Sequence, residues 1–155
     1  MDPNDLIPNL RGLPILSHIR DLAIVYALAF VIGWNREREE RSAGLRTFPL
    51  VGIASCSFIL IAEKFLPEAP NDSAQAMARI VEGVITGMGF IGGGAILKSG
   101  GEVHGTATAA SLWATGAMGV AVGLGAYDVA LLVCAFSAMT LYFIGKLKPQ
   151  PPPID

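Results

Sequence analysis

The sequence predicts an all-α protein, a polytopic integral membrane protein folded as a bundle of about five transmembrane helices. Hydrophobic residues make up 52% of the 155-residue chain and charged residues 15%, whereas charged residues are about 25% of an average soluble domain. The mean hydropathy is +0.53. The apolar residues also gather in segments close to the roughly 20 residues that a helix needs to cross a bilayer. We therefore expect the lipid bilayer to surround most of this chain.

The predicted spans are residues 19–34, 47–63, 80–97, 106–124 and 127–145. They define a membrane domain over 19–145, preceded by an N-terminal tail over 1–18 and followed by a Pro-rich C-terminal tail over 146–155. The connections are too short for a soluble catalytic domain, so we expect no enzymatic activity and no catalytic residues. The net charge of −2 argues against nucleic acid as a partner, because nucleic-acid-binding proteins carry basic patches.

Local signals support the ends of these spans. Arg20 and Asp21 open the first span and form either an ion pair at the membrane surface or part of a polar site. The second span starts near Pro49, which is tolerated in the first turn because the missing N–H group would be unpaired there. Gly125 and Ala126 alone separate the last two spans, which predicts a tight antiparallel hairpin. The fifth span is evenly apolar, so we expect it to be a lipid-facing support.

Glycine recurs in the third span, and small residues let membrane helices approach closely. We expect these glycines to pack against the fourth span and to form the central seam of the bundle. The last three either continue the helix or break it and expose backbone carbonyls. Part of the run also matches a dinucleotide-binding pattern, but that pattern needs a preceding strand, and a membrane span precedes it here. The packing glycines are Gly83, Gly87, Gly89, Gly92, Gly93 and Gly94.

Glu82 is a charged residue inside the third span, and Arg79 precedes it by one turn. Ionisable residues within membranes are costly and therefore indicate function. Either this pair anchors the span at the membrane edge, or Glu82 faces the interior and binds a proton or a hard cation. Mg²⁺ would be such a cation, because it prefers oxygen ligands, and it would be a substrate rather than a resident cofactor. The candidate cation or proton site comprises Glu82, Glu37, Thr86, Thr108 and Ser111, with Glu82 as the metal ligand if there is one.

Two other residue types give weaker signals. Cys56 and Cys134 fall within spans and are expected to be small buried apolar residues. The two histidines lie in predicted loops, so no zinc site is expected. Thr108, Ser111 and Thr115 share one face of the fourth span, and we expect that face to meet the glycines of the third span.

The connection after the first span, NREREERSAGLRT, is highly charged. It is either a solvated segment beside the membrane or a cytoplasmic gate and cation-attracting vestibule formed by Glu37, Arg38 and Arg46. Seven Lys or Arg residues fall on the side of this connection and four on the other. Because cytoplasmic loops are enriched in Lys and Arg, we expect the N-terminus outside and the C-terminus in the cytoplasm.

Two blocks, GWNREREERSAGLRTFPLVG at 33–52 and RIVEGVITGMGFIGGGAILKSGGEVHGTATAASLWATGAMGVAVGLG at 79–125, resemble the MgtC/SapB family of bacterial inner-membrane proteins. The resemblance covers nearly the whole membrane domain. It implies a plasma-membrane protein of five spans that is linked with magnesium homeostasis, either by carrying Mg²⁺ or by regulating other membrane proteins. The positions that match family motifs are Arg36, Glu37, Arg41, Gly44, Leu45, Arg46, Thr47, Gly87, Gly89, Phe90, Gly92, Gly94, Thr108 and Trp113.

The chain also departs from the family pattern. Asn35 stands where the family often has Glu, and Phe48 stands where a polar residue is common, so a site that used those groups would be weaker here. The sequence ends in KPQPPPID where longer members carry a soluble C-terminal domain, which favours the short, SapB-like branch.

The sequence therefore predicts a bacterial inner-membrane protein of magnesium transport or homeostasis. The alternative is a non-transporting membrane interaction protein that regulates another membrane complex through its glycine-rich helix seam. The expected partners are the lipid bilayer, further copies of the chain and other membrane proteins.

Overall fold

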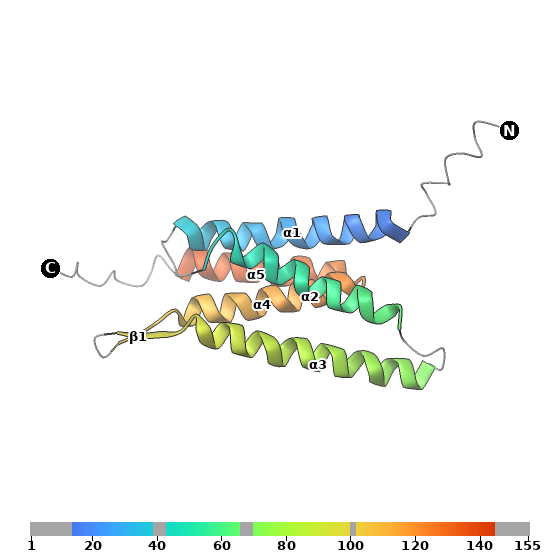
Figure 1. Cartoon of the computed structure of the whole chain (residues 1–155). Coiled ribbons are helices and arrows are strands. Elements are labelled where there is room, and N and C mark those ends of the chain that lie inside the picture. The colour runs from blue at the N-terminus through green and yellow to red at the C-terminus, as the bar shows by residue number, and fades with distance from the viewer. Residues whose placement is uncertain (1–13, 39–42, 66–69, 100–101, 145–155) are drawn as a thin grey trace, which may run out of the picture.

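Helices dominate the computed structural model of the chain, which describes residues 14–38, 43–65, 70–99 and 102–144 (Figure 1). The helices α1 (Pro14–Arg38) and α5 (Tyr127–Met139) both begin at one end of the bundle and end at the other. A short π-helical turn, Thr140–Ile144, extends α5. The elements are α1 (Pro14–Arg38), α2 (Thr47–Glu63), α3 (Pro70–Gly94), β1 (Leu97–Ser99), β2 (Glu102–His104), α4 (Thr106–Gly123) and α5 (Tyr127–Met139).

Proline and glycine set the ends of several helices. Pro14 and Pro70 are the first residues of α1 and α3, and Pro49 lies in the first turn of α2, where proline removes no helical hydrogen bond. Gly125 adopts a φ of 74° directly after α4. The amide of the next residue, Ala126, donates to the Ala121 carbonyl at 2.8 Å. The predicted tight hairpin between the last two helices is therefore confirmed.

Several boundaries differ from the prediction: α1 ends at Arg38 rather than at residue 34, and α3 ends at Gly94 rather than at residue 97. α1 begins at Pro14, inside the expected tail, and α3 begins at Pro70 rather than at residue 80. Hydropathy marks the apolar part of a helix and therefore misses the polar first turns of α3, whereas α1 begins at a proline that is followed by the apolar Ile15 and Leu16. α3 runs through Gly92 and Gly93 and ends at Gly94, so the glycine run forms the last turn of a continuous helix.

A small β-hairpin follows α3 where the sequence predicted only a loop. Its strands are antiparallel, with Leu97 opposite His104 and Lys98 opposite Val103. Residues 100–101, between the two strands, lie outside the described residues. Gly105 then leads into α4 with a φ of 85°. A Cβ atom at Gly105 would overlap the carbonyl oxygen of Ala95, so this junction requires glycine.

α4 is the central helix, and it packs against all four other helices. Its most extensive contact is with α2, where glycine brings the two backbones together. A Cβ atom at Gly119 would lie 2.5 Å from the carbonyl oxygen of Gly52, and one at Gly123 would lie 2.7 Å from the Cβ atom of Ile59. The expectation of a glycine seam between the third and fourth helices is thus corrected, because the close glycine contact joins α2 and α4.

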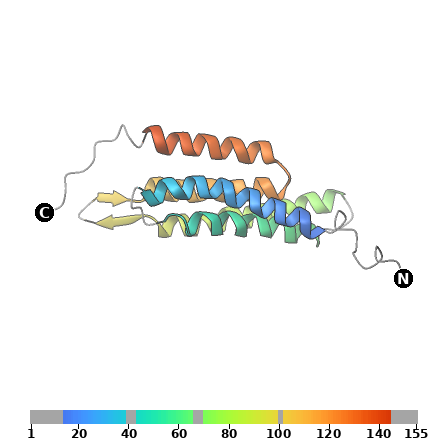
Figure 2. The same cartoon turned by 90° about the horizontal axis from the view of Figure 1, so that it is seen from above.

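The outer helices lie on either side of this centre. α3 is the outermost helix on one side of the bundle (Figure 1), and α5 lies along another side when the bundle is seen from above (Figure 2). Only Ala130 and Cys134 of α5 are buried. Large apolar side chains of α5 consequently point outward, such as Leu131 and Phe136, which are 60% and 61% exposed. Phe58 of α2 is also 56% exposed.

One helix among the described residues is long and apolar enough to cross a membrane, namely residues Ile15–Arg38. Thr47–Glu63 and Tyr127–Phe143 are apolar but shorter. This criterion therefore does not confirm five spanning helices, although the helices themselves are present. Glycine, serine and threonine lower the mean hydropathy of α3 and α4, and α3 also carries the charged residues Asp72, Arg79 and Glu82.

Candidate functional site

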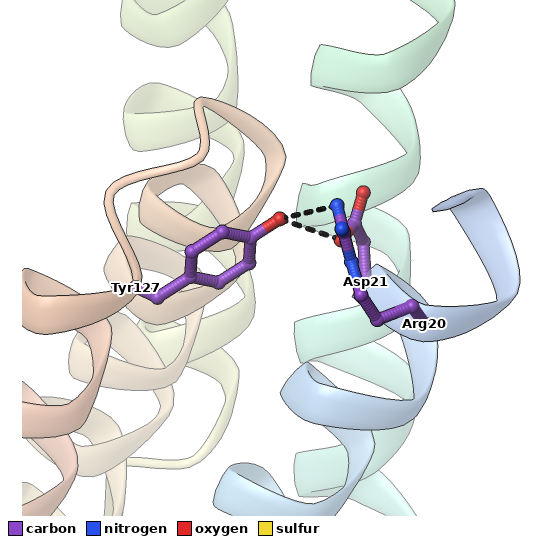
Figure 3. A network of polar contacts seen from close by, with 3 residues as sticks. All are labelled: Arg20, Asp21 and Tyr127. Carbon is purple, nitrogen blue, oxygen red and sulfur yellow. Dashed lines mark hydrogen bonds and ion pairs between the residues drawn. The ribbon is translucent and has the colours of Figure 1, made fainter.

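A polar junction of three side chains joins the start of α1 to the start of α5 (Figure 3). The Tyr127 hydroxyl donates to Oδ1 of Asp21 at 2.8 Å, and Arg20 Nε donates to the same oxygen at 2.9 Å. Arg20 Nη2 in turn donates to the Tyr127 hydroxyl at 2.7 Å. Asp21 is only 6% exposed. The guanidinium of Arg20 balances its charge, and the hydroxyl of Tyr127 adds a hydrogen bond. The junction fixes α5 against α1 at this end of the bundle.

The exposed part of the junction is the guanidinium of Arg20. Its side chain is 58% exposed, and its Cζ atom lies 5.5 Å from the centroid of the Tyr127 ring, which is within the range of a cation–π contact. The sequence indicated the Arg20–Asp21 pair, and the structure confirms it. Tyr127 was missed because it lies 106 residues from Asp21, and no local pattern marks that contact.

The candidate cation residues do not come together. Glu82 is exposed on α3, and the Thr86 hydroxyl donates to the backbone oxygen of Glu82 at 2.8 Å. On α4, Thr108 is buried and the Ser111 hydroxyl donates to the Ala107 carbonyl at 2.6 Å. The hydroxyls of Thr86 and Ser111 therefore donate hydrogen bonds to backbone carbonyls of their own helices. Among the described residues no three His, Cys, Asp or Glu side chains form a group that could hold a metal ion.

The hydroxyl-bearing face of α4 is directed elsewhere than expected. The Cγ2 atom of Thr115 lies 3.6 Å from where a Cβ atom of Gly52 would be, so Thr115 packs toward α2. α3 instead contacts α4 through Met88, which lies against Gly116, and through Gly92, which faces the Ala109 carbonyl. The expectation that Thr108, Ser111 and Thr115 face the glycines of α3 is corrected.

At most glycines of α3, no other described residue fills the space that a side chain would occupy. A Cβ atom at Gly92 would lie 3.4 Å from the Ala109 carbonyl oxygen, whereas at the other five predicted positions it would meet nothing within 4 Å. Phe90, on the same side as the bare glycines, is 86% exposed. We call this exposed side the α3 face; it comprises Arg79, Glu82, Gly83, Thr86, Gly87, Phe90, Gly93 and Gly94, all of them exposed.

The charged connection before α2 is organised by Glu37. Its Oε2 atom accepts a hydrogen bond from the Leu45 amide at 3.0 Å, and Gly44 lies so close that a Cβ atom there would overlap that oxygen. Glu37 thus holds the chain entering α2 at Leu45; a gate of Glu37, Arg38 and Arg46 was one of the two alternatives that the sequence left open for this connection. Arg46 is exposed at the N-cap of α2, Thr47 is the first residue of that helix, and Arg41 lies outside the described residues.

Arg36 is buried, whereas Arg38 and Arg46 are exposed. Arg36 is only 3% exposed, and its Nη2 atom donates to the Asn35 side-chain oxygen at 2.8 Å. The side-chain carbonyl of Asn35 therefore accepts a hydrogen bond from a buried guanidinium. This is the position where family members often have Glu and where the resemblance predicted a weaker site.

Comparisons with known proteins agree with this arrangement of motifs. The model of the MgtC family matches residues 22–149. Protein SrpB of Synechococcus elongatus is 36% identical over 135 residues, which cover 82% of this chain and 74% of that protein. Protein MgtC of Salmonella typhimurium is 37% identical over 117 residues, which cover 76% of this chain and 48% of that protein.

A further relative, protein MgtC of Brucella abortus, is 36% identical over 123 residues, which cover 79% of this chain and 49% of that protein. The chain thus spans about half the length of these MgtC proteins and about three quarters of SrpB. No solved structure matches the chain. Because the family match extends from α1 to beyond α5 and includes the charged connection and the glycine-rich helix, this chain belongs to the MgtC family.

Proposed function

We propose that this chain is a multi-pass protein of the bacterial inner membrane, with its N-terminus outside and its C-terminus in the cytoplasm. The spanning length of α1 supports a membrane location. So do the large apolar side chains on the outer surfaces of α2 and α5, such as Phe58 and Phe136, because water-soluble monomers rarely expose extended apolar patches. Membership of the MgtC family supports a role in magnesium homeostasis.

Within that role, the α3 face binds another membrane helix. The observation that carries this proposal is the bare surface of the α3 face, where a Cβ atom at Gly83, Gly87, Gly93 or Gly94 would meet no described residue within 4 Å. Lipid tails and apolar side chains are alike in polarity, so membrane helices associate where small residues allow close backbone packing. A face with exposed glycine backbone and the carboxylate of Glu82 is poorly suited to lipid and well suited to a helix.

The positions of the candidate cation ligands favour this binding role over transport. A transport path needs polar groups that line one route, yet Glu82 lies on the outer face of α3 while Ser111 and Thr115 are buried on α4. The hydroxyls of Ser111 and Thr115 donate to carbonyls of their own helix at 2.6 and 2.9 Å.

Two measurements test the proposal. The first is Mg²⁺ entry into sealed liposomes that contain the purified protein, compared with empty vesicles and with the Glu82→Gln variant over a range of gradients and voltages. We expect no entry above that of empty vesicles. Entry that Glu82→Gln abolishes, with the fold intact, would make the chain a transporter and overturn the binding role.

The second measurement is growth of cells at limiting Mg²⁺ with the chain supplied in place of the native protein. Gly87→Ile should abolish the growth benefit, because it places a bulky side chain on the α3 face at a position where a Cβ atom would meet no described residue within 4 Å. Ala135→Ile is the matched control, since Ala135 is exposed on α5. Equal growth of the two variants would exclude a binding function for the α3 face.

A further inference from the structure

We infer that the partner of the α3 face is the α3 face of a second copy of this chain, related to the first by a two-fold axis along the membrane normal. This inference rests on the proposed binding function of that face and names its occupant. In a two-fold pair each residue of the interface meets the same surface on the other copy, so the face must complement itself in position, shape and charge.

The position of the face leaves it free for a second copy. α3 packs on α4 through Met88 and Gly92, and the α3 face is formed by residues on the opposite side of the helix. α3 is also the outermost helix of the bundle (Figure 1). Arg79, Thr86 and Gly93 recur at intervals of seven residues along the face, a spacing that keeps one seam in register with a neighbouring parallel helix.

The shape of the face is self-complementary. Phe90 is 86% exposed, and the residues three before, three after and four after it are Gly87, Gly93 and Gly94, which are its neighbours on the helix surface. The aromatic ring of Phe90 therefore projects from a helix surface where the neighbouring residues are glycines with exposed backbone, which we call the glycine floor. In a two-fold pair each ring lies on the glycine floor of the other copy, as a knob fits a hole in packed helices.

The charge of the face is also self-complementary. Arg79 and Glu82 lie one helical turn apart on the same face, and both are exposed, so the face carries one charge of each sign. Two copies inserted in the same orientation bring each Arg79 beside the partner's Glu82, which gives two equivalent ion pairs. Val81 lines the same apolar cavity as Leu124, at the end of α4, so these pairs lie near the end of the bundle, where water can reach the guanidinium.

Disulfide cross-linking of the full chain in liposomes tests the inference. Cys56 and Cys134 are first replaced by alanine, and a single cysteine is placed at Gly83, where the structure leaves space for it. Because a disulfide needs Cα atoms within about 7 Å, oxidation should link two chains only if the α3 faces meet. Leu131→Cys, on the exposed side of α5, is the matched control and should give no linked pair. Adding Gly87→Ile should abolish the link at position 83.

A charge-mixing experiment separates contacts between chains from those within one chain. Glu82→Arg alone makes the face doubly positive, and Arg79→Glu alone makes it doubly negative. Each variant by itself should cross-link at least about tenfold less than the parent, because like charges would meet across the axis. A mixture of the two variants should recover the linked pair. Interactions within one chain are the same in the mixture as in the separate samples, so recovery arises only from contact between copies.

The outcomes distinguish this inference from the proposed function. If no link forms at position 83 while the thermal transition of the variants is unchanged, the second copy is not the partner. The binding function would then still stand if Gly87→Ile abolished growth at limiting Mg²⁺. If the link forms and Gly87→Ile leaves growth unchanged, the pair of copies is confirmed and the proposed function is overturned.

Discussion

Replacement of Gly119 by alanine should destabilise the bundle strongly, whereas the same replacement at Gly87 should not. A Cβ atom at Gly119 would lie 2.5 Å from the Gly52 carbonyl oxygen and 2.7 Å from the Cβ atom of Ser55. The carbonyl oxygen of Gly52 belongs to the backbone of α2, and the Cβ atom of Ser55 is bonded directly to it. Neither atom can rotate away, so α2 and α4 must separate. Overpacking of this kind costs about 1–3 kcal/mol. For a chain of this size that corresponds to a melting temperature lower by roughly 3–10 °C.

Gly87 provides the opposite case within the same protein. A Cβ atom there would meet nothing within 4 Å, and alanine favours a helix over glycine by up to about 1 kcal/mol. Gly87→Ala should therefore leave the stability of the single chain unchanged or slightly higher. The contrast between the two variants isolates packing, because both make the same chemical change in a helix.

Thermal unfolding of the purified protein in detergent measures both variants. Cys56 and Cys134 are buried, so a thiol-reactive dye reports the unfolded fraction, and circular dichroism gives an independent midpoint. Both native cysteines are kept in these variants, because they are the reporters. A Gly119→Ala protein that melts with the wild type would refute the close contact of α2 and α4. Equal losses in both variants would show that glycine stabilises these helices for a reason other than packing.

Two further predictions concern single contacts. Tyr127→Phe should destabilise the protein by about 1–3 kcal/mol, because Asp21 loses a hydrogen bond in a buried position. Tyr26→Phe changes an exposed ring and should change the stability by less than about 0.5 kcal/mol. Equal midpoints of the two variants in thermal unfolding would show that the junction contributes nothing to stability. Gly125→Ala should lower the stability by about 1–2 kcal/mol, because Gly125 has a left-handed backbone conformation. Gly105→Ala should lower the stability more, because its Cβ atom would also overlap a carbonyl oxygen. The yield of folded protein and the unfolding midpoint measure both losses, and the reverse order would contradict the geometry at the start of α4.

The sequence predicted the order of the helices and many of their ends. Thr47–Glu63 is the predicted second span and is also α2, and the hairpin at Gly125 follows from the local need for a positive φ. These features depend on residues close together in the chain, such as an apolar run, a proline in a first turn or a glycine after a helix. Family membership was likewise carried by contiguous motifs, and the comparisons confirm it.

The tertiary structure decided which faces meet. α4 has small residues around most of its circumference, so its sequence fits α2 and α3 almost equally well, and only the assembled bundle shows that Gly119 packs on Gly52. The junction of Asp21 with Tyr127 joins residues 106 positions apart, for which no local pattern exists. Glycine density marked α3 as a packing helix, but the direction of its bare face depends on where the other helices lie. Local physics therefore determined the elements, and competition among similar helix surfaces determined their partners.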